Sequence, residues 1–278
     1  MERHEGAADG PVAAAATDGI ARMLERRAAK PFKTFTVAVE QMSGAGTTWL
    51  IRRMRASMTD TPFSETMMTT VGFDYAMFLF PARPLSTAPR GSLTRRALGI
   101  PDDYAHPDMP PKPLLLTMTE AGGQARFQEL RRSHMHSQAD TFLLVYSVVW
   151  RESFVELQAR LRLVRDTPTR ARIMLVGTQS DRDPDPDTPD GRVSREEAEA
   201  WAEAEGLLFL GEVSAATGDG VDAALERMAQ EGGRIFGLKL TGRPAHVTCS
   251  DLRRMGLVGP RAADRRATER PRRRCTVQ

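Results

Sequence analysis

One short segment combines residue types that could bind a phosphate group. Residues 34–39 are β-branched and apolar, as in a buried strand, residues 41–48 form a glycine-bearing turn, and residues 49–54 begin a helix. Backbone N–H groups of such a turn converge on one point, and the helix N-terminus adds partial positive charge there. Thr48, in the first helical turn, could then hold a magnesium ion. The same pattern is also typical of an ordinary turn and helix cap.

The elements that must position this turn alternate along the chain. Apolar runs at residues 114–118, 141–149, 173–177 and 207–213 predict strands, and a 3.6-residue pattern at 154–164 predicts a helix. Ser194 is a predicted N-cap, with Glu197 completing a capping box, and the last helix should end near Phe236. Alternating strands and helices predict an α/β fold, with an open, mostly parallel sheet and helices on both faces.

The turn resembles the Walker A loop of small GTPases, G-x-x-x-x-G-K-[ST]. Gln41 stands in place of the first Gly, and Thr47 stands in place of the Lys that reaches the β- and γ-phosphates. The resemblance implies that the loop binds nucleotide, with magnesium at Thr48, and the matching positions are Ser43, Gly44, Ala45, Gly46, Thr47 and Thr48.

Two further segments resemble the switch motifs of the same family. Residues 69–75 are similar to T-[IV]-G-x-D-[FY], which implies that Thr70 closes over magnesium and the γ-phosphate, although the same residues also alternate as one strand face. Residues 119–127 are similar to W-D-T-A-G-Q-E-R-F, with Glu120 at the magnesium position, Gly123 at the γ-phosphate and Gln124 as the catalytic, water-orienting residue. A different register places Thr119 and Gly122 there instead and leaves no acid.

The strongest match follows the strand at 173–177. Thr178, Gln179 and Asp181 are similar to the guanine-recognition motif [NT]-[KQ]-x-D, in which the Asp carboxylate accepts two N–H bonds from the guanine edge. Ser214, Ala215 and Ala216 resemble the S-A-K/L loop that contacts the guanine O6 through its backbone. An Asp after a strand is also often only a turn residue.

Together these motifs identify residues 33–236 as similar to the Ras superfamily of small GTPases, with Rab-like and Rho-like features. The resemblance implies a P-loop NTPase G-domain with a mostly parallel six-stranded sheet, bound GTP or GDP with Mg²⁺, and effector or regulator proteins as partners. Losing the loop Lys removes a charge-assisted contact worth about 1.5–3 kcal/mol, so nucleotide affinity should fall. Slow hydrolysis is expected because it depends on electrostatic stabilisation of charge on the γ-phosphate. The alternative is a pseudoGTPase scaffold that binds a partner independently of nucleotide. Gln124, Thr48, Thr70 and Asp181 favour the switch, whereas Thr47, Gln41 and Glu120 favour the scaffold.

Composition divides the 278 residues into a globular body and two ends. Residues 1–31 are predicted to be a disordered extension, residues 32–238 the G-domain with a proline-rich, irregular insertion at 81–112, and residues 239–278 a basic disordered tail. The two Cys residues are far apart in sequence, which indicates neither a disulfide framework nor a zinc site and favours an intracellular compartment. No run of apolar residues is long enough to span a membrane as a helix. Residues 237–278 hold 11 Lys or Arg against 3 Asp or Glu, whereas the rest of the chain is mildly acidic. Any polyanion-binding role is therefore expected in the tail.

The last residues form a predicted lipid-attachment box. Cys275 is fourth from the end, Val277 is aliphatic, and the final Gln278 favours farnesyl over geranylgeranyl. One lipid chain binds membranes only marginally, and seven Arg between 261 and 274 supply the second signal on an anionic surface. We therefore expect the protein on the cytoplasmic face of a membrane, with no nucleic-acid partner. A solvated basic tail with an incidental Cys is the alternative.

Overall fold

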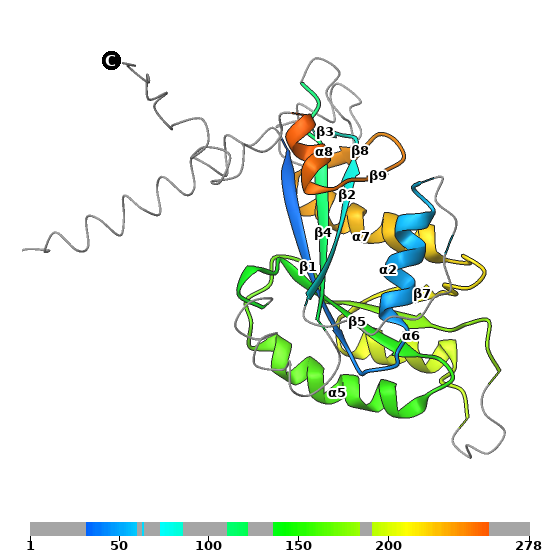
Figure 1. Ribbon diagram of the computed structural model, residues 1–278. Coiled ribbons are helices and arrows are strands. Elements are labelled where there is room, and N and C mark those ends of the chain that lie inside the picture. Colours follow the sequence, from blue (N-terminus) through cyan, green and yellow to red (C-terminus); the bar gives the residue numbers. More distant parts are fainter. Residues whose placement is uncertain are drawn as a thin grey trace, which may run out of the picture.

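A seven-stranded sheet lies at the centre of the computed structural model, which describes residues 32–59, 63, 73–85, 110–121, 136–183 and 191–255 (Figure 1). The strand order is β7-β6-β5-β1-β4-β2-β9. Five of these strands run parallel, namely β1 (Lys33–Gln41), β4 (Leu114–Ala121), β5 (Thr141–Ser147), β6 (Met174–Thr178) and β7 (Leu208–Glu212). β2 (Phe73–Phe80) is antiparallel to β4, and β9 (Ala245–His246) is antiparallel to β2. The predicted α/β fold with a mostly parallel sheet is confirmed.

Helices cover both faces of the sheet, as expected. α2 (Thr47–Ala56) and α7 (Val221–Phe236) pack on one face, and α5 (Arg151–Arg165) and α6 (Arg195–Ala204) pack on the other. The helical spacing of buried residues explains this, since α5 buries Phe154, Leu157, Leu161 and Val164 on one side. Every residue of the central strand β5 is buried because helices lie on both of its faces.

The ends of α6 and α7 follow local sequence signals. The Ser194 side chain accepts a hydrogen bond from the backbone N–H of Glu197, so the predicted N-cap is confirmed. The Glu197 carboxylate, expected to complete a capping box, binds the Arg151 guanidinium instead, with N–O distances of 2.9–3.1 Å. α7 ends at Phe236 as predicted, and Gly237 follows it in the left-handed conformation (φ 62°).

The residues after α7 correct two predictions. β8 (Leu238–Leu240), β9 and α8 (Cys249–Arg254) lie in the segment predicted to be a disordered tail, so that prediction is wrong as far as residue 254. β9 also adds a seventh strand to the six expected. Val247 and Leu252 pack on Phe32 and Leu115, which explains the order, because apolar burial fixes a segment too short to show a periodic pattern. Pairing with β9 covers part of the β2 edge.

The proline-rich insertion is also shorter than predicted. β3 (Ala82–Pro84), inside the expected irregular range 81–112, pairs antiparallel with β8, and the Lys112 backbone N–H donates to the Ala82 carbonyl. The insertion therefore begins and ends in contact with the fold, while residues 86–109 lie outside the described residues. The remaining described element is a single 3-10 turn, η3 (His136–Gln138). Within the described ranges, no helix has the length and apolar character needed to cross a membrane.

Candidate functional site

The glycine-bearing loop connects β1 to α2 at the carboxyl edge of the parallel strands, where β1 lies between β4 and β5. Gly44 (φ 97°) and Gly46 (φ 83°) adopt the left-handed conformation, and Gly46 is the N-cap of α2. Ser43 is exposed and Ala45 is buried. Gln41 is the last residue of β1 and is buried, so this residue does not form part of the turn itself.

Thr178 and Gln179 hold the loop from the end of β6. The Thr178 hydroxyl donates to the Ala45 carbonyl at 2.5 Å and also lies 2.9 Å from the Tyr146 carbonyl. Gln179 accepts a hydrogen bond from the Ser147 hydroxyl at 2.5 Å. A Cβ at Gly46 would lie 3.2 Å from Thr178 Oγ1 and 3.6 Å from Gln179 Nε2. Close approach and positive φ together require glycine at residue 46.

A cavity of about 320 Å³ opens between this loop, the end of β6 and the segment after β7. Its volume falls in the range of small-molecule sites. Asp181 is exposed, so its carboxylate is accessible to a ligand. Six residues predicted from the sequence line this cavity, and they are Gly46, Thr178, Gln179, Asp181, Ala215 and Ala216. Ser214 is buried beside it, where its hydroxyl accepts from the Thr217 backbone N–H at 3.0 Å.

Three further residues line the cavity and were missed from the sequence, namely Trp49, Phe63 and Arg182. The Trp49 and Phe63 rings are 5.6 Å apart between centroids and form an aromatic wall. The sequence held a signal for Trp49, because a large aromatic residue directly after the turn must lie beside any ligand in it. Phe63 is an isolated aromatic residue within a polar stretch, and only its position in space connects it with the cavity.

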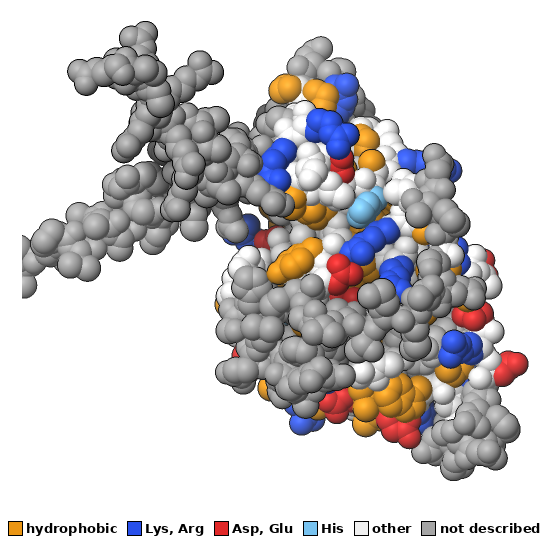
Figure 2. All heavy atoms as spheres, in the orientation of Figure 1, with side chains coloured by type: hydrophobic (Ala, Val, Ile, Leu, Met, Phe, Trp, Pro, Cys, Tyr) orange, Lys and Arg blue, Asp and Glu red, His pale blue; other side chains and the backbone are white. Residues whose placement is uncertain are grey.

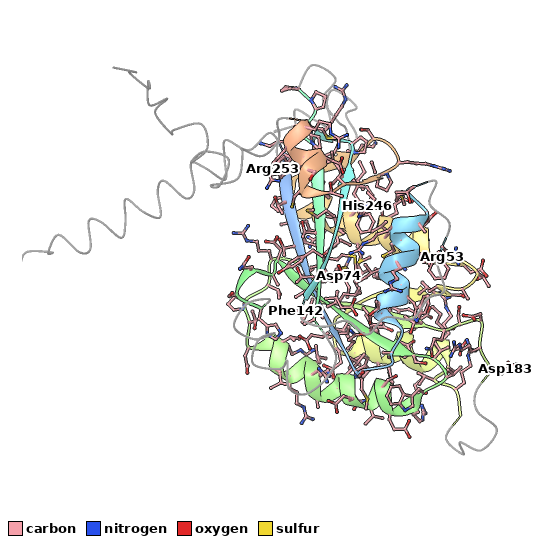
Figure 3. All side chains as sticks on the ribbon, in the orientation of Figure 1. Arg53, Asp74, Phe142, Asp183, His246 and Arg253 are labelled. Carbon is pink, nitrogen blue, oxygen red and sulfur yellow. The ribbon has the colours of Figure 1, made fainter. Side chains whose placement is uncertain are left out.

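Arg53, on α2, braces two sides of the cavity (Figure 3). Its Nε donates to the Ala215 carbonyl at 2.5 Å, and an Nη donates to the Ala216 carbonyl. Its guanidinium lies 3.8 Å from the centroid of the Phe63 ring. One cationic side chain therefore links the loop after β7 to the aromatic wall.

At the other end of the loop, Gln41, Thr48 and Glu120 form a closed hydrogen-bonded group. Glu120 Oε1 accepts from the Thr48 hydroxyl at 2.7 Å and from Gln41 Nε2 at 2.8 Å. Glu120 lies inside β4, fully buried, rather than in the turn predicted after a strand ending at residue 118. Two of the three departures from the Walker A and switch patterns, Gln41 and Glu120, are therefore in direct contact. No sequence pattern connects residues 79 positions apart.

Burial raises the pKa of the Glu120 carboxyl above its ordinary value, and the hydrogen bonds from Thr48 and Gln41 oppose this only in part. Asp74, opposite Glu120 on β2, raises it further, although Asp74 is itself paired with Arg55 at 2.9 Å. Glu120 Oε2 is buried and has no hydrogen-bond partner among the described residues. A hydroxyl and a carboxylate oxygen thus converge at one point, and hard oxygen donors of this kind fit a magnesium ion.

Thr47 occupies the position at which the Walker A pattern has Lys. Its side chain is buried on the core-facing side of α2, and within the described part of the chain its hydroxyl has no hydrogen-bond partner. Thr70, Gly123, Gln124 and Cys275 lie outside the described residues, so their predicted roles remain predictions. No group of three or more His, Cys, Asp or Glu side chains suited to a metal occurs among the described residues.

Comparison with known proteins agrees with this geometry. The Ras family model matches residues 97–232. A probable Ras-related protein Rab-4A from Echinococcus multilocularis is 37% identical over 107 residues, which are 38% of this chain and 45% of that protein. The Ras-related protein rab-39 from Caenorhabditis elegans is 31% identical over 121 residues, which are 42% of this chain and 50% of that protein. The match thus spans about half the length of each curated relative.

Over these residues the chain is similar to the Ras superfamily of small GTPases. Its sheet order and helix arrangement are those expected of a G-domain, so the predicted fold family is confirmed. The family match includes Thr178, Gln179, Asp181 and the loop after β7, but it begins after the Walker A segment at 41–48. Similarity to the Ras family is therefore carried by the elements around the cavity, while the sequence departs from the family pattern at the phosphate loop.

Proposed function

We propose that this protein binds guanine nucleotide, GTP or GDP, and acts as a switch in signalling or trafficking, with slow or impaired GTP hydrolysis. The observation that carries the proposal is the cavity lined by Thr178, Gln179, Asp181, Ala215 and Ala216. An exposed carboxylate can accept two N–H bonds from the guanine edge, whereas the adenine edge offers a different donor pattern. Trp49 and Phe63 add apolar surface beside the base.

Magnesium is the metal expected with the nucleotide. Thr48 and Glu120 would hold it, since their oxygens converge at 2.7 Å and Glu120 Oε2 has no partner in the described part of the chain. When bound, magnesium would neutralise phosphate charge. Gln41 would orient the longer Glu120 arm by its hydrogen bond, and Thr70 remains a predicted additional ligand.

Slow turnover follows from what the loop lacks. Thr47 offers a buried hydroxyl where a Lys ammonium would stabilise charge on the transferred phosphoryl group. The loop residues 42–46 contain no Lys or Arg. Gln124 is the residue we assign to orienting the attacking water. Binding therefore depends mainly on the base end, and hydrolysis loses its main electrostatic support.

The closed group of Gln41, Thr48 and Glu120 supports the second candidate, a pseudoGTPase scaffold. Gln41 and Thr48 both donate to Glu120 Oε1 without any ligand, and Thr178 holds the loop through the Ala45 carbonyl. A loop braced in this way can keep its shape while a partner protein binds elsewhere, whatever the nucleotide state.

Nucleotide content decides between the two candidates. The purified protein is heat-extracted and the nucleotides are identified, and fluorescent GDP, GTP and ATP analogues are then titrated. Retained or titratable guanine nucleotide, with weaker ATP binding, supports the switch. Absence of guanine-nucleotide binding at high micromolar protein supports the scaffold.

Membrane anchoring is part of the same proposal. It is supported by Cys275 and the seven Arg of residues 261–274, all outside the described residues. The protein carrying an N-terminal fluorescent tag should move from membranes to the cytosol on Cys275→Ser and lose a lipid mass shift. A variant that stays on membranes, beside a wild-type protein without lipid, would contradict the anchor.

A further inference from the structure

A concentrated positive charge lies at the end of the domain opposite the cavity. Seven Lys or Arg occur in the segments 32–33, 80–85, 110–114 and 236–255, against a single acidic residue, Asp251. We call this surface the basic face, and it consists of Lys33, Arg83, Lys112, Lys239, Arg243, Arg253 and Arg254.

Backbone pairing brings these separate segments together. The Lys33 N–H donates to the Pro113 carbonyl, and the Lys112 N–H donates to Ala82 in β3. β3 pairs with β8, and β9 pairs with the end of β2, so all these segments meet at the amino-terminal ends of β1 and β4. The cavity lies at the carboxyl ends of the same strands. Figure 3 shows the two ends, with Arg253 on α8 and Asp183 after β6 far apart.

Three side chains of the basic face are exposed, and the other four are half-buried. Lys239, Arg243 and Arg254 are exposed, and Figure 2 shows Lys and Arg side chains gathered over this end of the molecule. Glu231, a neighbouring acid at the end of α7, does not offset them, because Arg172 and Arg234 bind its carboxylate at 3.3 and 2.8 Å. The adjoining segment 86–109 contains three Arg and three Asp, so its formal charge is zero.

An apolar side chain and the start of the tail share this surface. Met255 is 55% exposed and directly follows Arg253 and Arg254 at the end of α8. Residues 256–278, which continue from this point, contain seven Arg against two acidic residues. Basic residues around an exposed apolar side chain match the chemistry of a membrane interface, where cations meet headgroups and apolar groups enter the acyl boundary.

We propose that the basic face docks the folded domain directly on an anionic lipid surface, with the cavity pointing away from the membrane. The tail is then a continuation of a membrane-binding surface rather than a tether that holds an acidic body off the membrane. The inference shares with the proposed function only the membrane location. It depends neither on nucleotide binding nor on a lipid at Cys275.

Vesicle binding of the unlipidated full-length protein tests the inference. Phosphatidylcholine vesicles with and without phosphatidylserine are compared for wild type and for Lys239→Gln/Arg243→Gln/Arg254→Gln, which leaves the tail intact. We expect this triple variant to bind the anionic vesicles about tenfold or more weakly, because each basic residue near an anionic surface contributes separately. Equal binding by wild type and variant would assign all binding to the tail and overturn the proposal.

A matched control removes three Arg elsewhere, Arg162→Gln/Arg195→Gln/Arg227→Gln. All three are exposed on α5, α6 and α7 and are not part of the basic face, and Arg195 is paired along its helix with Glu199 as Arg254 is with Asp251. This control should bind vesicles like wild type, and both variants should keep the wild-type unfolding midpoint. Equal losses in the two triple variants would indicate a general charge effect. Duplex DNA bound as tightly as anionic vesicles, and lost in the same variant, would indicate a nucleic-acid surface instead.

Cys249 provides a second readout of orientation. It is exposed on α8, and after Cys275→Ser it is the only Cys in the sequence. A polarity-sensitive dye at Cys249 should report a less polar environment with anionic vesicles and no change with neutral ones. The same dye on Arg162→Cys, in a Cys249→Ser/Cys275→Ser protein, should not respond. A response at residue 162 without one at 249 would overturn the proposed orientation.

Discussion

The base end and the phosphate end of the candidate site satisfy their polar groups in different ways. At the base end, Asp181 is exposed beside an open cavity, and the backbone of residues 215–216 is held from behind by Arg53. At the phosphate end, Gln41 and Thr48 both donate to Glu120, so the side chains bind one another. The base end is open to a ligand, whereas the phosphate end forms hydrogen bonds among its own side chains. Two buried atoms at the phosphate end, Glu120 Oε2 and the Thr47 hydroxyl, have no partner among the described residues.

In the proposed function, base recognition would be kept while phosphate binding is changed. Base recognition depends on loop backbone and one carboxylate, which the sheet positions at strand ends. Phosphate binding depends on individual side chains. Here two residues that differ from the family pattern, Gln41 and Glu120, contact each other. Glu120, one CH₂ longer than the family's Asp, is met by Gln41 in place of the family's Gly. Five predictions test this contrast, beginning with the largest expected effect.

Asp181→Asn should abolish guanine preference. It removes a carboxylate that accepts two charge-assisted hydrogen bonds, each worth about 1.5–3 kcal/mol, so GDP affinity should fall at least about a hundredfold. Affinity for ATP analogues should stay unchanged. Asp183→Asn is the matched control, because Asp183 is exposed on the same segment and does not line the cavity. Wild-type GDP affinity in Asp181→Asn, measured by fluorescence titration, would remove the basis for base recognition.

Thr47→Lys should strengthen the phosphate end. A restored ammonium group should tighten GDP and GTP binding by at least about 1.4 kcal/mol, a factor of ten, and raise single-turnover hydrolysis. Thr47→Val is the control, since it removes only a buried hydroxyl without a partner in the described part and should not improve binding. No gain with Lys would show that Gln41 and Glu120, rather than the missing charge, limit the site.

Gln41 and Glu120 should be energetically coupled in the nucleotide-free protein. Gln41→Met keeps the length of the side chain but removes the hydrogen bond, so the free energy of unfolding should fall by about 1 kcal/mol. In a double-mutant cycle with Glu120→Gln, the two losses should not add. Additive losses in urea unfolding would mean that the two substitutions are independent.

The same carboxyl predicts a pH dependence. Because burial raises the Glu120 pKa in the folded state, the folded protein binds this proton more tightly than the unfolded chain. The contribution of Glu120 to the free energy of unfolding is therefore fully present below the pKa that this carboxyl has in the unfolded chain. It is lost as pH rises through the raised pKa of the folded protein. Glu120→Gln should remove that decline.

Glu231 should act in the opposite sense. Burial alone would raise the pKa of its carboxyl, but hydrogen bonds from Arg234 and Arg172 outweigh burial and lower this pKa to about 2. Its contribution should be lost as pH falls towards 2.

Arg53→Met should have a small effect, confined to the base end. The apolar side chain keeps contact with Phe63 but cannot donate to the carbonyls of Ala215 and Ala216. Loosening this loop should raise the GDP dissociation rate about threefold to tenfold, as expected for roughly 1 kcal/mol of lost hydrogen bonding. Arg227→Gln, on the exposed side of α7, is the control. An unchanged rate, measured by displacement of a fluorescent analogue, would confine Arg53 to a structural role.

Much of the site could be predicted because its residues lie directly after strands. Parallel strands end at a common edge, so Thr178, Asp181 and the Ala215–Ala216 loop had to lie near the turn after β1. Glu120 was predicted to follow its strand, but β4 continues through it, because cross-strand pairing with β2 extends the strand to Ala121. Phe63 reaches the cavity from a separate segment and no motif places it there, whereas Trp49 directly follows the turn.

The sequence by itself determined the order of most strands and helices of the body, the resemblance to the Ras superfamily and the residue types at the strand ends, because hydrophobic periodicity and turn chemistry are local properties. Only the tertiary structure decided that Gln41 meets Glu120 and that Arg53, 162 residues away in sequence, holds Ala215. It also decided that β9 covers part of the β2 edge, that β8 pairs with β3, and that these segments gather a basic face. These contacts depend on strand register and on burial between distant segments, which local patterns do not encode.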